Sequence, residues 1–439
     1  MGRAGAGYVG RRTESTSGAR FTAGALTVPW RGGAYEHAMR SFDGERPMKA
    51  MLDGPPAIRG GRPAFPEGLP LARPSVPDPE GVAREIRSIL ESGVLTNGPY
   101  VAELERRAAE YFRVRHCVAV SSCTSGLMLV LRAAGLSGDV ILPSFTFAAT
   151  AHSVAWNGLR PAFVDIDPLT LTLSPATASW GTGMRTSAIL ATHTYGTPCD
   201  VEGLAEAAER SGIRLFYDAA HAFGSRHDGR PVGSFGDAEV FSLTPTKPVV
   251  AGEGGIIATN DDDLAEACRI GREYAKEPDY DSRFVGLNAR MSEFHAAVAL
   301  ASFEGLDQRI AERNRLAELY REALGAIPGI SFPEVRSGDL STYKDFTILV
   351  DAEEFGVAAS SLAEALTAEG IDVRRYYSPP VHRMRPYRSA GARLPVTDAA
   401  AARVVTLPLW VGMTEDHVAR VAEAMSRIRG FLGAPVAAP

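Results

Sequence analysis

The stretch Arg214-Leu-Phe-Tyr217-Asp218-Ala-Ala-His221-Ala-Phe-Gly224 contains a short apolar run that ends at a carboxylate. Similar runs recur along the chain and alternate with amphipathic helical patterns. This alternation is typical of an α/β fold with a mostly parallel sheet covered by helices on both faces. Ligands of such sheets bind at the carboxyl ends of the strands. The stretch therefore predicts both the fold class and one side of a binding site.

The same patterns predict a regular series of elements from about residue 80 onward. The expected strands are Cys117–Val120, Val140–Leu142, Pro161–Val164, Ala188–Ala191, Leu215–Tyr217, Val240–Ser242 and Gly255–Ala258. The expected helices are Tyr100–Phe112, Ser125–Ala134, Ala148–Asn157, Val201–Ser211, Met291–Phe303 and Ile310–Leu324. Asp218, Ser242 and the segment after Val120 all follow strand ends, so we expect them to converge on one site.

Composition excludes several classes of protein. The 439 residues are 45% hydrophobic and carry a net charge of -6, so the chain offers no overall attraction to nucleic acid or to anionic membranes. The four cysteines form no CxxC pair, and no histidines cluster at zinc spacing, so we predict reduced thiols and no metal site. No apolar stretch approaches the ~20 residues that span a bilayer, and the N-terminus lacks a signal peptide. We therefore predict a cytoplasmic protein.

A lysine in a glycine-rich setting gives the strongest chemical signal. Lys247 lies in Ser242-Leu-Thr-Pro-Thr-Lys-Pro-Val-Val-Ala-Gly-Glu-Gly-Gly255, which begins 24 residues after Asp218. Pyridoxal phosphate needs an amine that bonds to its aldehyde, an acid that keeps its ring nitrogen protonated, and donors for its phosphate. This chain supplies all three. The alternatives are a surface lysine on a mobile loop and a strand-end carboxylate that caps a turn.

Three further candidates each have a structural alternative. The run Ser121-Ser-Cys-Thr124-Ser125-Gly126 passes from strand to helix, where amides and hydroxyls suit a phosphate, although a plain helix N-cap fits it as well. Phe147 follows a strand end and would stack on a cofactor ring or join the core. His221 would lie near the cofactor or be a hydrogen-bonded core histidine.

Composition and pattern divide the chain into three parts. Residues 1–47 are rich in Gly, Arg, Ser and Thr without lasting periodicity, which predicts a disordered leader. Met48 and Met51 are alternative translation starts. Residues 48–328 are predicted to form a large cofactor-binding domain with an N-terminal lead-in segment. Residues 329–439 are predicted to form a small C-terminal α+β domain. Its expected elements are a strand at Asp345–Val350, a helix at Ala358–Ala368, a strand at Ile371–Val373 and a helix at Glu415–Phe431.

From about Pro66 to Leu432 the chain resembles the DegT/DnrJ/EryC1/StrS family of sugar aminotransferases. The blocks that carry the resemblance are Leu95–Glu103, Pro143–Phe147, Phe163–Asp167, Asp218–His221, Thr246–Lys247, Gly252–Gly255 and Gly286–Glu293. The resemblance implies a fold-type I pyridoxal phosphate enzyme with a mostly parallel seven-stranded sheet. Two blocks depart from the family pattern, because Ser122-Cys123-Thr124 replaces Ser-Gly-Thr and Tyr376-Tyr377-Ser-Pro379 replaces His-Tyr-x-Pro.

The resemblance also implies a role for each matched residue. Lys247 bonds to pyridoxal 5'-phosphate and moves protons, and Asp218 pairs with the ring nitrogen. Phe147 stacks on the ring. The matched phosphate-binding positions are Thr124, Ser125 and Ser242. Asn288 matches a residue that reaches the phosphate of the neighbouring subunit, which implies a homodimer with shared active sites.

The resemblance implies a transaminase that moves an amino group from glutamate to a nucleotide-linked keto-deoxyhexose. His221, which we count among the cofactor-binding residues, favours amination of a dTDP-4-keto-6-deoxyhexose at C4. The alternatives are a C3 sugar aminotransferase, an aminocyclitol aminotransferase and an aminoaromatic-ring-forming synthase. The presence of Lys247 disfavours a sugar 3-dehydratase. An alternative from another class is a catalytically silent regulatory protein of the same fold. The Ala, Gly and Arg content suits antibiotic biosynthesis in a GC-rich bacterium.

Overall fold

The computed structural model describes residues 54–388 and 391–432. The leader predicted over residues 1–47 and the alternative starts at Met48 and Met51 lie outside the described residues. Within the described part, no helix is both long enough and apolar enough to cross a membrane.

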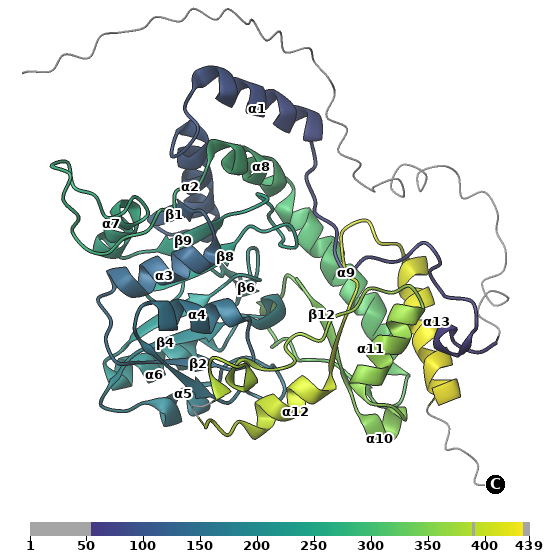
Figure 1. The fold of residues 1–439 in the computed structure, drawn as a ribbon. Coiled ribbons are helices and arrows are strands. Elements are labelled where there is room, and N and C mark those ends of the chain that lie inside the picture. The colour runs from purple at the N-terminus through teal and green to yellow at the C-terminus, as the bar shows by residue number, and fades with distance from the viewer. Residues whose placement is uncertain (1–53, 389–390, 433–439) are drawn as a thin grey trace, which may run out of the picture. The chain divides into compact units, whose positions relative to one another are not determined.

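A seven-stranded sheet forms the centre of the larger part of the molecule (Figure 1). Its order is β1(His116–Val120), β9(Gly255–Thr259), β8(Ala238–Ser242), β5(Arg214–Asp218), β4(Thr186–Thr192), β2(Asp139–Pro143) and β3(Arg160–Val164). The strand β9 pairs antiparallel with both of its neighbours, whereas the other neighbouring pairs are parallel. The predicted mostly parallel, seven-stranded sheet is confirmed.

Side chains of successive strand residues pack on opposite faces of this sheet. In β5, Phe216 joins one apolar cluster and Tyr217 joins the other. The helices α2(Pro99–Phe112) and α6(Val201–Ser211) pack on the Tyr217 face. The helices on the Phe216 face are α3(Cys123–Ala133), α4(Ala148–Trp156) and α7(Asp262–Gly271). Burial on both faces explains why the strands are apolar throughout rather than alternating.

The register of the strands brings their carboxyl ends together. Asp218 at the end of β5 lies beside Thr192 of β4 and Val240 of β8. The strand β8 ends two residues later, at Ser242. The expected convergence of these strand ends is therefore present, and the site lies along this edge of the sheet.

Most predicted element bounds agree with the structure to within two residues. The helix that we expected to begin at Ser125 begins at Cys123, because the Ser122 hydroxyl accepts from the Ser125 amide and acts as the N-cap. Five α-helices in the described residues were not predicted, namely α1(Pro79–Ser92), α5(Pro175–Gly181), α7, α10(Ala352–Phe355) and α12(Pro395–Arg403). The helix α9(Leu306–Gly325) begins four residues before its predicted start at Ile310.

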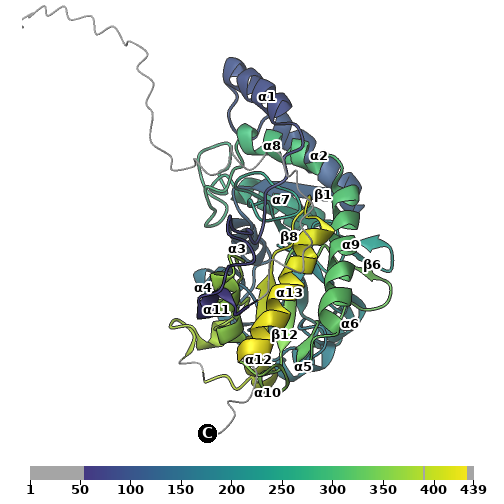
Figure 2. The same ribbon diagram turned by 90° about the vertical axis from the view of Figure 1, so that its right-hand side faces the viewer.

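A second apolar core lies at the other end of α9. Leu306 and Ile310 pack in the core beside the seven-stranded sheet, whereas Leu316 and Tyr320 pack in the second core. The elements of the second core are β10(Ile330–Ser331), β12(Phe346–Val350), α11(Ala359–Ala368), β13(Val404–Leu407) and α13(Glu415–Leu432). Figure 2 shows α13 running alongside α9. The division into domains near residue 329 stays a prediction.

The lead-in segment packs on the second core. Phe65 and Leu69 are buried there. The fully buried carboxylate of Glu369 accepts hydrogen bonds from the backbone amides of Ala57 (2.9 Å) and Ala64 (2.8 Å). This contact explains why the lead-in is ordered although it has few residues of regular structure.

The predicted strand at Ile371–Val373 is wrong. Ile371 forms a single bridge with Leu69, and Arg374 forms a single bridge with Thr406. A β-strand requires several consecutive paired residues, and this segment has one paired residue on each side. The remaining predicted elements of the C-terminal part are present as β12, α11 and α13.

Candidate active site

A cavity of ≈ 340 Å³ opens at the carboxyl ends of the strands. Six of the eight predicted site residues line it, namely Thr124, Phe147, Asp218, His221, Ser242 and Lys247. They come from four separate stretches of the chain, so the fold brings them together. A volume of this size suits a bound cofactor with part of a substrate.

The lysine lies on a turn that follows β8. The Lys247 amide donates to the carbonyl of Thr244 at 3.0 Å, and Leu243 donates to Gly254 at 3.0 Å, so the turn is closed by backbone hydrogen bonds. Burial, together with the nearby positive charge of Lys344, lowers the pKa of Lys247 to about 7, although the negative charges of Asp345 and Asp218 oppose the shift. Much of the Lys247 amine is therefore uncharged at neutral pH, as a nucleophile requires.

The lowered pKa of Lys247 predicts the pH at which pyridoxal phosphate attaches to cofactor-free protein. Only the uncharged amine attacks an aldehyde, so the attachment rate should rise with pH and level off above about pH 7. Stopped-flow absorbance of the attached cofactor would measure this profile, with free lysine in the same buffers as control. A rate that keeps rising toward the ordinary lysine value of 10.5 would contradict the buried amine.

Asp218 is almost fully buried at the floor of the cavity. Its Oδ2 accepts from the Thr150 hydroxyl at 2.6 Å, and its Oδ1 accepts from the Ala220 amide at 3.1 Å. Burial raises the pKa of Asp218, and the hydrogen bonds from Thr150 and Ala220 oppose that shift. A buried carboxylate is stabilised by a cationic partner, and a protonated ring nitrogen would supply one.

The N-terminus of α3 forms a cradle for an anion. Cys123 and Thr124 supply the first amides of the helix, which have no carbonyl partner within it. The Cys123 thiol lies 3.6 Å from the carbonyl of Val240, and burial raises the pKa of this thiol well above its ordinary value. The side chain of Cys123 thus points into the sheet, so its amide stays available despite the departure from the family pattern.

A glycine allows this cradle to lie against the sheet. A Cβ atom on Gly255 would be 2.6 Å from the Cys123 nitrogen and 2.8 Å from the Phe241 carbonyl oxygen. Both atoms belong to backbone, which cannot move aside without shifting the helix start or the strand. Gly255 is therefore required by close approach.

Two predicted site residues do not line the cavity. The Ser125 hydroxyl donates to the Ser122 carbonyl at 2.8 Å and accepts from the Ser122 amide at 3.1 Å, so it serves the capping box. Asn288 is exposed on the segment before α8(Glu293–Phe303), where its Oδ1 lies 3.4 Å from Arg290. Their proposed contacts with phosphate stay predictions.

The aromatic and imidazole candidates lie on the cavity wall. Phe147 precedes α4, and its side chain is 61% exposed although it lines a cavity, which leaves its face free to stack on a planar ring. His221 is buried, and burial lowers its pKa well below the ordinary value, with Lys247 and Lys344 adding to the effect. Its imidazole is therefore neutral.

Several cavity residues were not predicted as site residues. Thr150 of α4 was also not predicted; it is fully buried outside the cavity lining and acts on the site only through its hydrogen bond to Asp218. Lys344 and Asp345 reach the cavity from the segment before β12, more than 95 residues from Lys247. No local pattern indicates such a distant contact.

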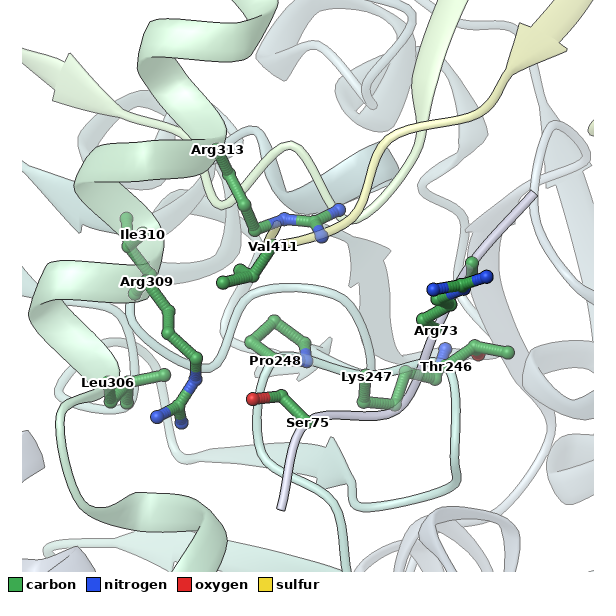
Figure 3. Close-up of a pocket in the computed structure, with 11 residues that line it drawn as sticks. Arg73, Ser75, Thr246, Lys247, Pro248, Leu306, Arg309, Ile310, Arg313 and Val411 are labelled. Atoms are coloured by element: carbon green, nitrogen blue, oxygen red, sulfur yellow. The ribbon is translucent and has the colours of Figure 1, made fainter. Parts of the chain in front are cut away.

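A second hollow lies on the other side of the turn that carries Lys247 (Figure 3). It has a volume of ≈ 20 Å³, about the space of one water molecule, and α9 borders it through Arg309 and Arg313. It is too small for a cofactor, so the ≈ 340 Å³ cavity is the candidate active site.

Residues 79–426 match the model of the DegT/DnrJ/EryC1/StrS aminotransferase family. The chain belongs to this family. It is 40% identical to DesI, whose structure was solved in the presence of its TDP-sugar product, with a TM-score of 0.82 and coverage of 86% of this chain and 96% of DesI. The expected family, fold class and transaminase class are confirmed at this level.

Two other relatives carry different names. The UDP-2-acetamido-2-deoxy-3-oxo-D-glucuronate aminotransferase of Pseudomonas aeruginosa is 34% identical over 327 residues, which cover 74% of this chain and 89% of that protein. The pleiotropic regulatory protein of Geobacillus stearothermophilus is 33% identical over 353 residues, which cover 79% of this chain and 93% of that protein. Proteins that resemble this chain therefore differ in the nucleotide that their names give and in described role.

Proposed function

We propose that this family member is a pyridoxal phosphate-dependent aminotransferase that converts a nucleotide-linked keto-sugar to an amino sugar with glutamate as donor. The observation that carries the proposal is the meeting of Lys247, Asp218 and the N-terminus of α3 in one cavity. These groups match the aldehyde, the ring nitrogen and the phosphate of the cofactor. Phe147 and Ser242 complete the proposed binding set.

When bound, the cofactor accepts the amino group of the donor and stores the electrons of the broken Cα–H bond. The carboxylate of Asp218 holds a proton on the ring nitrogen, and Thr150 and Ala220 keep that carboxylate in place. The Lys247 amine, displaced by the donor, takes the proton from the glutamate Cα atom. It returns a proton to the sugar carbon in the second half of the cycle.

For the acceptor we propose a dTDP-4-keto-6-deoxyhexose that is aminated at C4. Support comes from DesI, which was solved with a TDP-sugar product, and from His221 at the position that favours C4 chemistry. The P. aeruginosa relative acts on a 3-oxo sugar carried by UDP, so a C3 acceptor is the alternative. An aminocyclitol acceptor is a further alternative, and only acceptor assays separate the three.

A panel of acceptors tests the proposal. The protein, loaded with pyridoxal phosphate and glutamate, should aminate a dTDP-4-keto-6-deoxyhexose faster than its 3-keto isomer, its UDP and GDP counterparts, and a keto-cyclitol. Product mass and 2-oxoglutarate release would be measured. Preference for the 3-keto isomer or the cyclitol would replace the C4 assignment, and absence of any amination would remove the proposed acceptor class.

The regulatory alternative makes a separate prediction about the cofactor. A protein that had lost its chemistry would not convert its cofactor when glutamate is added. The visible absorption band of the purified protein should shift on addition of glutamate alone if the transaminase assignment is right. This measurement is needed because the chain is also similar to a Geobacillus protein that is named as regulatory.

We also propose a cytoplasmic homodimer in which Asn288 serves the partner's site. Asn288 is exposed and does not line the cavity of its own chain. Large apolar side chains in nearby segments are exposed, as expected where a partner covers them: Val94, Leu95, Tyr274, Tyr280 and Val285. A neutral amide at residue 288 would donate a hydrogen bond to phosphate without adding charge.

Mixed dimers test this arrangement. Lys247→Ala and Asn288→Ala subunits are each expected to be impaired. In a mixed dimer, one of the two sites carries neither lesion if the sites are shared, so part of the activity should return. Differential tags would verify subunit exchange, and each variant carried through the same exchange with a tagged copy of itself would be the control. No recovery in verified mixed dimers would show that Asn288 serves its own chain's site.

A further inference from the structure

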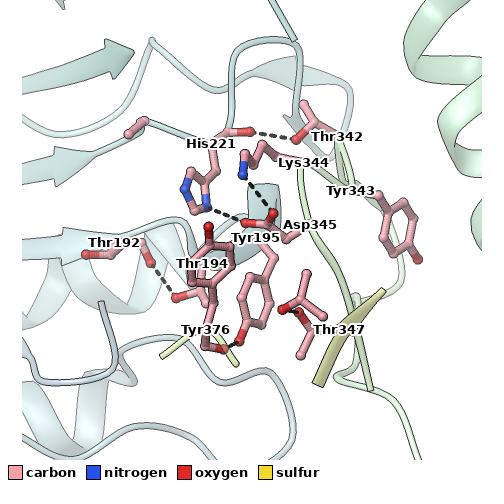
Figure 4. Close-up of polar contacts among 12 residues, drawn as sticks. Thr192, Thr194, Tyr195, His221, Thr342, Tyr343, Lys344, Asp345, Thr347 and Tyr376 are labelled. Carbon is pink, nitrogen blue, oxygen red and sulfur yellow. Dashed lines mark hydrogen bonds and ion pairs between the residues drawn. The ribbon is translucent and has the colours of Figure 1, made fainter. Parts of the chain in front are cut away.

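A buried ion pair forms part of the cavity wall (Figure 4). Lys344 and Asp345 precede β12 and are 8% and 5% exposed. The Lys344 Nζ atom lies 2.7 Å from Asp345 Oδ1 and 5.6 Å from the centre of the Tyr376 ring. Neither charge has a role in holding the ring or the phosphate of the cofactor in the arrangement proposed above, so the pair remains to be explained.

The backbone that carries this pair is firmly held. The Thr342 hydroxyl donates to the carbonyl of His221 at 2.6 Å. The guanidinium of Arg313 in α9 donates to the carbonyls of Thr342 and Lys344, each at 2.9 Å. Ordered positions of this kind favour recognition, because little conformational entropy is lost when a ligand binds.

Two polar atoms beside the pair have no hydrogen-bond partner within residues 54–388 and 391–432. They are Asp345 Oδ2 and His221 Nδ1, and they lie 3.8 Å apart. Since His221 is neutral, this contact is not an ion pair, and 3.8 Å is too long for a hydrogen bond. The distance still allows one hydroxyl oxygen to contact both atoms. A buried polar atom without a partner is costly, so both atoms favour a ligand that supplies the missing bonds.

The charges indicate what kind of ligand group fits. Lys344 and Asp345 together carry no net charge, so they offer N–H donors and a carboxylate acceptor without attracting an anion. A ligand carboxylate would be repelled by Asp345. A neutral hydroxyl, which both donates and accepts, satisfies Asp345 Oδ2 and His221 Nδ1 at once.

The small number of lysines in the chain draws attention to Lys344. The chain has only four lysines, Lys49, Lys247, Lys276 and Lys344, among 46 basic residues. Two of the four line this one cavity. A flexible ammonium with three rotatable donors suits hydroxyl groups, whereas arginine suits the planar geometry of carboxylate or phosphate.

We propose that Lys344 and Asp345 bind the sugar hydroxyl on the carbon next to the one that is aminated, and so select the acceptor sugar. The inference rests on the proposed function, because it needs a keto-sugar in this cavity. The pair lies in the same cavity as Lys247, which acts on the reacting carbon, so a neighbouring hydroxyl is the ligand group within reach.

Measuring the glutamate and keto-sugar half-reactions separately distinguishes binding of the sugar hydroxyl from binding of the amino donor. Removing one member of a buried ion pair leaves the other charge unpaired and destabilises the fold, so the main variant is the doubly neutral Lys344→Met/Asp345→Asn protein. Its kcat/KM for the keto-sugar should fall by roughly 10- to 100-fold relative to its kcat/KM for glutamate. Asp351→Asn, which changes the N-cap of α10(Ala352–Phe355) at the other end of β12, is the matched control.

An acceptor that lacks the hydroxyl provides the decisive comparison. For a 4-keto sugar this is the 3-deoxy analogue. The parent should discriminate against the analogue by a similar factor, and the double variant should lose that discrimination. Calorimetric binding of the nucleotide-linked amino sugar product should weaken in parallel.

Each other outcome has a distinct meaning. If the loss falls mainly on the glutamate half-reaction, the pair serves the amino donor and the proposal is overturned. Full retention of discrimination in the double variant also overturns it. If the parent itself aminates no keto-sugar, the proposed function fails instead.

Discussion

Replacing Lys247 with alanine is expected to reduce turnover by more than about 10³-fold while the protein remains folded. The side chain supplies the amine that bonds to the cofactor and moves protons, and no other lysine lies on the same turn. Steady-state release of 2-oxoglutarate would measure the loss. The absorption band of the covalently attached cofactor should also disappear.

The fold should survive because the ammonium of Lys247 contributes little to packing. Its pKa is lowered by burial, so the charged form is disfavoured in the folded protein, and alanine removes that cost. Thermal melting of the cofactor-free variant should therefore match the parent or exceed it. Arg210→Ala, at an exposed cation on α6, is the control and should keep full turnover. Normal aminotransfer by pure Lys247→Ala protein would refute the assignment.

The sequence predicted the fold well because its signals are local. The strands are short apolar runs, and their burial on both faces of the sheet produces the pattern directly. Helix starts were less certain, since α3 begins at Cys123, after the Ser122 cap, and not at Ser125. The strand expected at Ile371–Val373 failed for a non-local reason, because a strand needs a partner with several consecutive pairs and this segment meets one residue on each side.

The site was predictable where residues follow strand ends. Asp218, Ser242 and Thr124 belong to this group, and strand topology brings them into one cavity. Lys344 and Asp345 were not predictable, because they approach from the segment before β12, through backbone contacts to Arg313 that no local pattern encodes. Asn288 is different again, because its proposed contact requires a second chain.

Replacing Asp218 with asparagine is expected to lower kcat by at least about 10²-fold while cofactor still binds. Asparagine keeps the shape, and its one carbonyl oxygen accepts from either the Thr150 hydroxyl or the Ala220 amide, but it carries no charge to hold a proton on the ring nitrogen. The effect should appear in kcat more than in the KM for glutamate. Asp200→Asn at the N-cap of α6 makes the same chemical change outside the cavity lining and should keep its activity.

The same substitution should not weaken the cofactor-free fold, and this separates a functional carboxylate from a structural one. Burial raises the pKa of Asp218 above its ordinary value of 3.8, so the charged form is disfavoured in the folded state. The charge therefore destabilises the fold at neutral pH, and this penalty fades as pH falls through the raised pKa toward 3.8. Cofactor-free Asp218→Asn protein should melt at or above the parent temperature at pH 7, with a smaller difference in acid. A variant that melts lower at pH 7 and keeps its kcat would show that Asp218 only stabilises the strand end.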